Sequence, residues 1–328
     1  MARSHEEERR SRRRRRLTRG LLLGAAAFGL PALYNAWVAR RTAELTYPSW
    51  QAPEELQTSL GRVAVRRLGE ERPGGPIVLL HSLAPGHSSS HWQAVGRRLA
   101  AHRSVVLFDW PGWGDSQRGP YEYAPVSLAA VLQEVLDAGP RPSAPVAVVA
   151  AGLAAAPAVR FANRFPDRLR SLTLVCPRGA EGSRPALRDR LLRGMLGLPV
   201  LGTSAIHLAT SRRALETQLV ASFHDPHRIP EDLLDEHEKL SHLPGSRHPL
   251  TAYLTGGLDD GVLDRWARLP LGELHLIWGR EARSPEVVDA DLWLKRRGAA
   301  LHVVEGAGSL PHLERPEATA ELLRSILS

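Results

Sequence analysis

Nucleophilic and ligand-forming side chains gather in three parts of this sequence. The segment APGHSSSHW places three serines between His87 and His91, a combination that could supply a nucleophile and a base. The single cysteine, Cys176, follows an apolar run and could act as a thiol nucleophile. Six histidines between Pro177 and Pro270 could bind a metal: His207, His224, His227, His237, His242 and His248.

A structural interpretation of each group is simpler, and we favour it. Ser and His residues before an amphipathic helix commonly satisfy its free N–H groups, so the loop predicts capping and turn hydrogen bonds. A lone cysteine at a strand end is more often a packing residue. Pro226 separates His224 from His227, and no Glu or Cys completes a known ligand pattern. We therefore expect scattered surface or partly buried imidazoles, and neither a metal nor another cofactor.

The elements that must position these residues are predicted by apolar runs that alternate with amphipathic stretches over about residues 56–328. This alternation is typical of α/β proteins with a mainly parallel sheet. A helical segment at about 178–270 interrupts the pattern, and we expect it to be a lid inserted between late strands. The predicted strands are Ile77–His81, Ser104–Phe108, Val146–Ala150, Ser171–Val175, Glu273–Trp278 and Ala300–Val304.

Composition excludes several function classes. The chain has 328 residues, with 43% hydrophobic and 24% charged side chains, which is typical of a globular protein. Residues 1–41 contain 11 Arg and 3 Glu and so carry the whole net charge of +8, because residues 42–328 hold 32 basic and 32 acidic side chains. A neutral body gives no electrostatic reason to bind a phosphate backbone, so we expect no nucleic-acid partner.

The amino-terminal region predicts a membrane location. A basic tail, residues 1–19, precedes an uncharged run, residues 20–39, whose 20 residues would span roughly 30 Å as a helix. The arginine excess before this run predicts an anchor with a cytoplasmic amino terminus and an extracytoplasmic domain. Two alternatives remain open: an export signal of the twin-arginine type at Arg14–Arg19, giving an exported soluble protein, and a helix that packs on the domain. Residues 40–55 are interpreted as a linker.

Five segments in order resemble the α/β-hydrolase superfamily over essentially the whole domain, and in particular its membrane-anchored, lid-bearing members. The segments are PIVLLHSLAPG, SVVLFDWPGWGDS, VAVVAAGLAAAPAVRFANRFPDRLRSLTLVCP, LHLIWGREA and LHVVEGAGSLPHLERPE. The resemblance implies an α/β fold with a mainly parallel α/β-hydrolase-type sheet. It also implies a Ser-His-acid triad, with the serine on a sharp turn between a strand and a helix.

This turn reads Ala150-Ala151-Gly152-Leu153-Ala154, so the nucleophile position is Gly152. Glycine adopts the awkward backbone conformation of this turn without strain but brings no hydroxyl. The resemblance places the acid at Ala282, one residue beyond Glu281, and the histidine at Ser309. His312, three residues later, matches a position usually used for packing. None of the three catalytic positions therefore carries its side chain.

An oxyanion hole could survive this loss. By position, the donors would be the backbone N–H groups of Leu83 and Leu153, which could bind a carboxylate or carbonyl, or water alone. The usual His-Gly pair before the first donor reads His81-Ser82. Asp109 and Asp115 are expected to brace the adjacent loop.

Three functions follow from these observations. The first is a pseudoenzyme that binds a small or lipid-like ligand, or a protein partner, without turnover. The second is a hydrolase of carboxylic esters or lipid-like substrates with a non-standard catalytic constellation, such as the oxyanion hole together with a water. The third is a structural subunit of a membrane complex.

Overall fold

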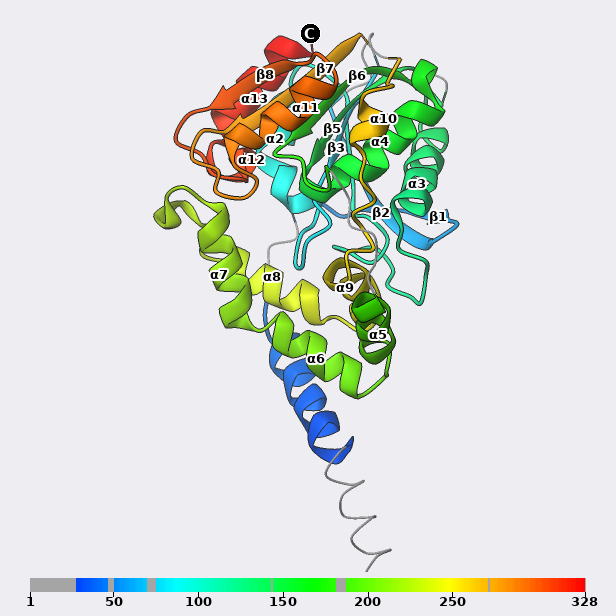
Figure 1. Cartoon of the computed structure of the whole chain (residues 1–328), viewed down its shortest axis with the longest axis vertical. Coiled ribbons are helices and arrows are strands. Elements are labelled where there is room, and N and C mark those ends of the chain that lie inside the picture. The colour runs from blue at the N-terminus through cyan, green and yellow to red at the C-terminus, as the bar shows by residue number, and fades with distance from the viewer. Residues whose placement is uncertain are drawn as a thin grey trace, which may run out of the picture.

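The structure is a computed structural model that describes residues 28–46, 50–69, 75–142, 144–180, 187–270 and 272–327. At its centre lies an eight-stranded sheet with the order β1-β2-β4-β3-β5-β6-β7-β8 (Figure 1). The six strands predicted from the sequence are present, and neighbours among them pair in parallel. They are β3 (Ile77–Leu80), β4 (Val105–Phe108), β5 (Val146–Ala151), β6 (Leu169–Val175), β7 (Glu273–Gly279) and β8 (Ala300–Val304).

Two further strands at the sheet edge were not predicted. β1 (Glu54–Thr58) and β2 (Gly61–Leu68) form an antiparallel hairpin, and β2 pairs antiparallel with β4. The sequence of β1, EELQT, is polar and largely exposed, so it lacks the apolar run that marks a buried strand. The segment 40–55, predicted to be a linker, lies partly within regular elements. A helix over residues 28–43 includes its first residues, and β1 begins at Glu54 near its end.

Helices cover both faces of the sheet, and alternate strand residues point to opposite faces. On one face, Leu79 and Val149 pack with α2 (Gln93–Ala100) and α13 (Pro316–Ile326). On the other face, Val78 and Val148 join a larger core. The helices of this second face are α3 (Pro125–Asp137), α4 (Ala155–Arg164), α10 (Leu263–Trp266) and α11 (Ala290–Arg296). Because all six residues of β5 are buried, the turn that follows this strand is held rigidly.

A helical insertion lies between β6 and β7 along the chain, as the sequence predicts. We use this name for residues 187–254, whose five helices gather at one end of the sheet (Figure 1). Beyond it, α10 returns to the body and contacts α4. The helices of the insertion are α5 (Leu187–Leu196), α6 (Leu201–Ala209), α7 (Arg212–Ser222), α8 (Leu233–His242) and α9 (Arg247–Leu254).

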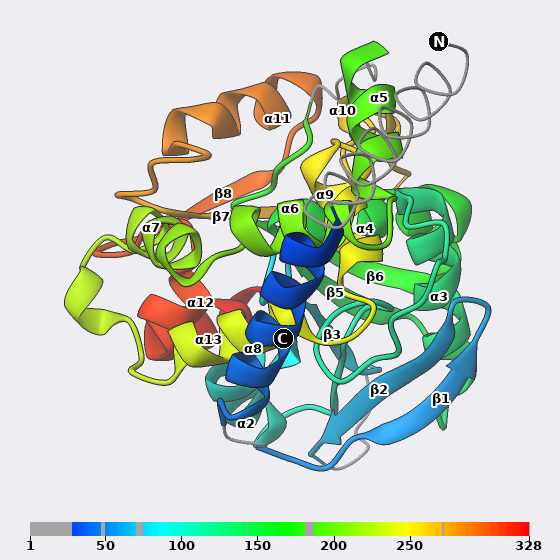
Figure 2. The same ribbon diagram turned by 90° about the horizontal axis from the view of Figure 1, so that it is seen from below.

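The helix over residues 28–43 packs on this insertion (Figure 2). Asn35 donates a hydrogen bond to the Val200 carbonyl and accepts one from Ser204 in α6. Among the described helices, none alone has the length and apolar character to cross a membrane, although α5 and the stretch Leu201–Ser222 would qualify together with a bend of 107°. Residues 1–27, with the basic tail and the first part of the predicted anchor, lie outside the described residues.

Candidate functional site

The turn after β5 has the shape expected of a nucleophile elbow. Gly152 has φ +53°, a left-handed conformation that favours glycine, and it begins the short 3-10 helix η2 (Gly152–Ala154) that leads into α4. A Cβ atom on Gly152 would lie 2.5 Å from Ser82 Oγ and 3.0 Å from Ser82 Cβ. The Ser82 side chain therefore fills the space into which a side chain at position 152 would extend.

The Ser82 hydroxyl also uses one of the two predicted oxyanion donors. It accepts a hydrogen bond of 3.3 Å from the Leu153 backbone N–H. Leu83, the other predicted donor, is fully buried. Among the described residues, no imidazole lies within hydrogen-bond distance of the Ser82 hydroxyl, so we find no base that could activate it.

His81 has a structural role next to this corner. The Trp110 backbone N–H donates to Nε2 of His81 at 3.1 Å, so Nε2 carries no proton. Nδ1 then donates to the Ser82 carbonyl at 2.8 Å. Burial lowers the pKa of His81, which keeps the ring neutral. Both ring nitrogens are thus engaged in holding the loops after β3 and β4.

Ala282 and Ser309, the acid and histidine positions predicted from the sequence, bring no carboxylate or imidazole to the site. Ala282 is buried and forms a backbone turn with Gly279. Glu281, the adjacent carboxylate, accepts a hydrogen bond from the Ala307 backbone N–H at 2.9 Å, so it holds this loop in place. The Ser309 hydroxyl donates to the Ser284 carbonyl at 3.0 Å.

The loop that would carry the catalytic histidine is fastened to the insertion. The Ser309 N–H donates to the Ser222 carbonyl at the end of α7, at 2.8 Å. Buried Glu314, in α12 (Pro311–Glu314), accepts hydrogen bonds from the backbone N–H groups of Gly308, His224 and Asp225 at 2.7–3.0 Å. The sequence analysis missed Glu314 because its partners come from separate parts of the chain.

His312 and Cys176, the remaining candidates, are buried apart from any partner that could activate them. The His312 ring stacks on Trp92 with centroids 4.1 Å apart, and burial lowers its pKa to about 3. Burial raises the pKa of the Cys176 thiol to about 12, so the reactive thiolate is scarce at neutral pH. In the described part of the chain, no histidine forms a hydrogen bond with the Cys176 sulfur.

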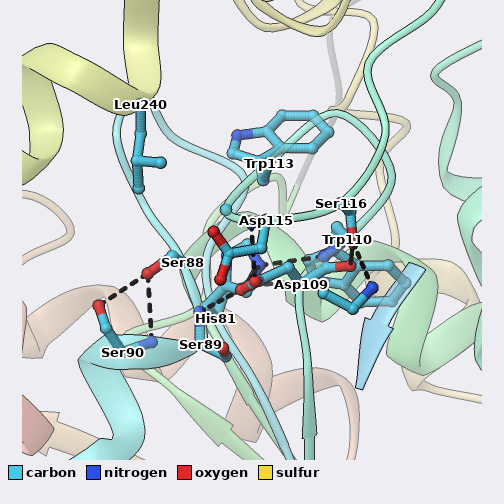
Figure 3. A network of polar contacts seen from close by, with 12 residues as sticks. His81, Ser88, Ser89, Ser90, Asp109, Trp110, Trp113, Asp115, Ser116 and Leu240 are labelled. Atoms are coloured by element: carbon cyan, nitrogen blue, oxygen red, sulfur yellow. Dashed lines mark hydrogen bonds and ion pairs between the residues drawn. The ribbon is translucent and has the colours of Figure 1, made fainter. Parts of the chain in front are cut away.

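Asp109 braces the loops after β3 and β4, as expected from the sequence (Figure 3). Its carboxylate accepts hydrogen bonds from the backbone N–H groups of Ser89 at 2.6 Å and Asp115 at 2.9 Å, and it pairs with Arg66 at 3.0 Å. Burial alone would raise the pKa of Asp109, but the Arg66 guanidinium and the backbone N–H donors outweigh it and hold this pKa below its ordinary value.

The loop after β3 also contributes to a buried histidine cluster. His87, His91 and His237 are all buried, and one ring nitrogen of each lies within 4.8 Å of the other two. Burial lowers the pKa of each, to about 3 for His237, so the imidazoles are neutral. The expectation of scattered histidines in the insertion is therefore wrong for His237. The contact of His237 with His87 and His91 could not be predicted from spacing, because these partners lie about 150 positions earlier in the chain.

Comparison with known proteins supports the same architecture. The model of the alpha/beta hydrolase family matches residues 77–322. The chain is 26% identical to the dihydrolipoyllysine-residue acetyltransferase component of the acetoin cleaving system of Pseudomonas putida, over 91% of this chain and 76% of that protein. It is 27% identical to the pimeloyl-[acyl-carrier protein] methyl ester esterase of Aeromonas salmonicida, over 80% of this chain and 98% of that protein.

The solved structures add a fold match over nearly the full length. A membrane phospholipase A, described as a bacterial virulence factor, superposes with a TM-score of 0.67 at 21% identity and covers 96% of this chain and 98% of its own. A meta-cleavage product hydrolase superposes with the same TM-score at 18% identity, over 84% of this chain and 97% of its own.

Proposed function

The chain belongs to the alpha/beta hydrolase family, and we propose that it is a catalytically degenerate member, a pseudoenzyme that binds a ligand or partner without turning it over. One observation carries the proposal: the Ser82 side chain occupies the space of the nucleophile and accepts the Leu153 N–H that would otherwise stabilise an oxyanion. The substitutions at Ala282 and Ser309 support it, because serine hydrolysis needs a base and a group that orients the base.

Ester hydrolysis tests the proposal directly. We expect the full chain to hydrolyse p-nitrophenyl acetate no faster than buffer, and the Cys176→Ala and Ser82→Ala variants to give the same rate. Parental turnover that the Ser82→Ala or Cys176→Ala variant abolishes would overturn the proposal. It would favour a hydrolase of carboxylic esters or lipids that uses a non-standard site.

We also propose that the predicted anchor, residues 20–39, continues into the helix over residues 28–43 and that α5 rests on the same membrane beside it. The two helices lie at the same end of the molecule (Figures 1 and 2). On the first helix, Asn35 and Val38 face the protein, while Leu30 and Leu33 are 67% and 69% exposed. On α5, the exposed apolar residues Leu187, Leu191 and Met195 recur every four positions and form one face, and exposed Leu198 follows the end of the helix.

Vesicle flotation tests this part of the proposal. With 3:1 phosphatidylcholine–phosphatidylglycerol vesicles, we expect the parent chain to float. Two glutamates in the Leu30→Glu/Leu33→Glu variant should lower the floated-to-sedimented ratio at least tenfold, because each replaces apolar contact worth about 1.5–3 kcal/mol. The control is Val126→Glu/Val288→Glu, two exposed valines outside both helices, which should float like the parent. Equal flotation of both variants would contradict the proposed surface.

The proposed topology places the large domain on the extracytoplasmic side, because the arginines precede the anchor. We expect protease added to intact cells to digest the domain. Protection of the domain until the cells are lysed would contradict this orientation.

A small or lipid-like ligand would require the insertion to act as a lid. A cavity of about 10 Å³ lies between the insertion and the loops of the body, with Gly86, Trp113 and Leu240 in its wall. This volume holds about one water molecule, so a larger ligand must displace α8. Oleate is a suitable probe: saturable binding that changes the fluorescence of the buried tryptophans would support a lipid-like ligand. Its absence would favour a protein partner.

A further inference from the structure

Three buried imidazoles meet where the insertion contacts the body of the protein. His87 belongs to the loop after β3, His91 to the 3-10 helix η1 (Ser89–Trp92), and His237 to α8. Nε2 of His91 and Nε2 of His237 are 3.1 Å apart. The ring centroid of His87 lies 4.4 Å from that of His91 and 5.2 Å from that of His237.

The local backbone is built to bring these rings together. Gly86 has φ +76°, and a Cβ atom there would lie 2.4 Å from His237 Cα, so only glycine lets the loop approach α8 this closely. Beside the cluster, the Glu236 carboxylate accepts hydrogen bonds from the Ser88 hydroxyl at 2.8 Å and the Ser90 hydroxyl at 2.6 Å. The same serines lie beside the Asp109 network (Figure 3). These contacts fix the loop that bears His87 and His91 against the helix that bears His237.

The cluster leaves polar atoms without partners. The buried Nδ1 atoms of His87 and His91 have no hydrogen-bond acceptor or donor in the described part of the chain. A buried polar nitrogen without a partner costs about 1–3 kcal/mol, and a ligand on Nδ1 of His87 would remove one of these two costs. Neutral imidazoles offer lone pairs, and the ligand that three converging lone pairs fit is a cation.

We propose that His87, His91 and His237 bind one Zn²⁺ ion, which fastens α8 of the insertion to the loop after β3. With Zn–N bonds of about 2.0–2.1 Å, a tetrahedral site separates its nitrogen ligands by about 3.3 Å. The 3.1 Å between the Nε2 atoms of His91 and His237 is close to this value, and a ring nitrogen of His87, within 4.8 Å of a ring nitrogen of each, supplies the third ligand.

The ligand set determines the type of site. Imidazole suits Zn²⁺, Cu²⁺ and Ni²⁺, and three protein ligands leave the fourth tetrahedral position for water or an exogenous ligand. Glu236 is a positioning residue, since its hydrogen bonds hold the loop rather than the ion. The site joins two segments about 150 residues apart, so metal binding should stabilise the closed position of the insertion.

Metal titration of the full chain, purified without a polyhistidine tag and treated with a chelator, tests the proposal. We expect one Zn²⁺ per chain by calorimetry. Co²⁺ should give the visible d–d absorption of a tetrahedral site with nitrogen ligands. The His237→Ala variant should bind Zn²⁺ at least about 100-fold more weakly, because it removes one of three ligands. The matched control is His227→Ala, an exposed histidine of the same insertion, which should bind like the parent.

Several results would overturn the proposal. These are no saturable Zn²⁺ binding by the parent, equal affinity in the parent and His237→Ala, or equal loss in the His227→Ala control. If His237→Ala does not fold, the His87→Ala variant replaces it, with folding checked by far-UV circular dichroism. A Co²⁺ band that persists in folded His87→Ala would also contradict the site. Ester hydrolysis plays no part in these readouts, so they are independent of the proposed function.

Discussion

A serine returned to the elbow should destabilise the protein unless the serine at position 82 is removed. In the Gly152→Ser variant, the new Cβ would meet Ser82 Oγ at 2.5 Å and would hold a left-handed conformation at φ +53°. The backbone penalty for a non-glycine residue there is about 1–2 kcal/mol, and overpacking costs about 1–3 kcal/mol. We therefore expect Gly152→Ser to lower the free energy of unfolding by about 2–5 kcal/mol.

The second variant separates the two causes. Ser82→Gly on top of Gly152→Ser removes the overpacking but not the backbone penalty, so the double variant should recover the overpacking cost of about 1–3 kcal/mol less the cost of Ser82→Gly itself. Ser82→Gly alone costs about 0.5–1 kcal/mol in chain entropy. This cost cancels in the double-mutant cycle, so the relieved overpacking should give a coupling energy clearly above zero.

Urea unfolding followed by circular dichroism measures all four proteins. Gly194→Ser is the matched control, because nothing lies within 4 Å of a Cβ at Gly194 in α5, and it should be neutral or slightly stabilising. A coupling energy within about 0.5 kcal/mol of zero would refute the argument that Ser82 occupies the space of the nucleophile. Neither serine variant should gain ester hydrolysis, since both still lack a base.

Three further predictions concern buried groups. Asp109, whose pKa is held low in the folded state, contributes stability above its unfolded pKa of about 3.9, and this is lost as pH falls through the folded pKa. Asp109→Asn should therefore flatten the acid limb of the stability–pH curve, and an unchanged limb would contradict the pairing with Arg66. Cys176, with its pKa near 12, should react with a disulfide reagent at pH 8 orders of magnitude more slowly in the folded than in the urea-unfolded chain, and rates within tenfold would contradict its burial. Glu314→Ala leaves three backbone N–H groups without their acceptor, so it should lower the free energy of unfolding by about 2–4 kcal/mol, and a loss below about 1 kcal/mol would show that water replaces the carboxylate.

The sheet and the elbow could be predicted from the sequence because their signals are local. Buried parallel strands need continuous apolar runs, and Val146–Ala151 is such a run. A tight turn between a strand and a helix needs small residues, and the register around Gly152 follows from the strand before it and the helix after it. The β1–β2 hairpin lacked such a signal, since an exposed edge strand can be polar throughout.

The packing at the site could not be predicted, because it depends on contacts between distant segments. The sequence shows Ser82 in place of a glycine and Gly152 in place of a serine, but only the fold places the first side chain in the space left by the second. Likewise, His237 meets His87 and His91 only because α8 crosses over the loop after β3. Spacing along the chain carries no information about such an approach.

The attachment of the amino-terminal helix has a mechanical consequence. Arg41 forms an ion pair with Glu238 in α8, and Lys239 of the same helix donates a hydrogen bond to the Leu45 carbonyl. A pull on the amino-terminal helix, such as thermal undulation of a bilayer would exert, is thus applied to α8 before it reaches the sheet. Because Glu236 and His237 occupy the neighbouring positions of α8, tension on the amino-terminal helix would reach the contacts that these two residues make with Ser90 and His91 of the body.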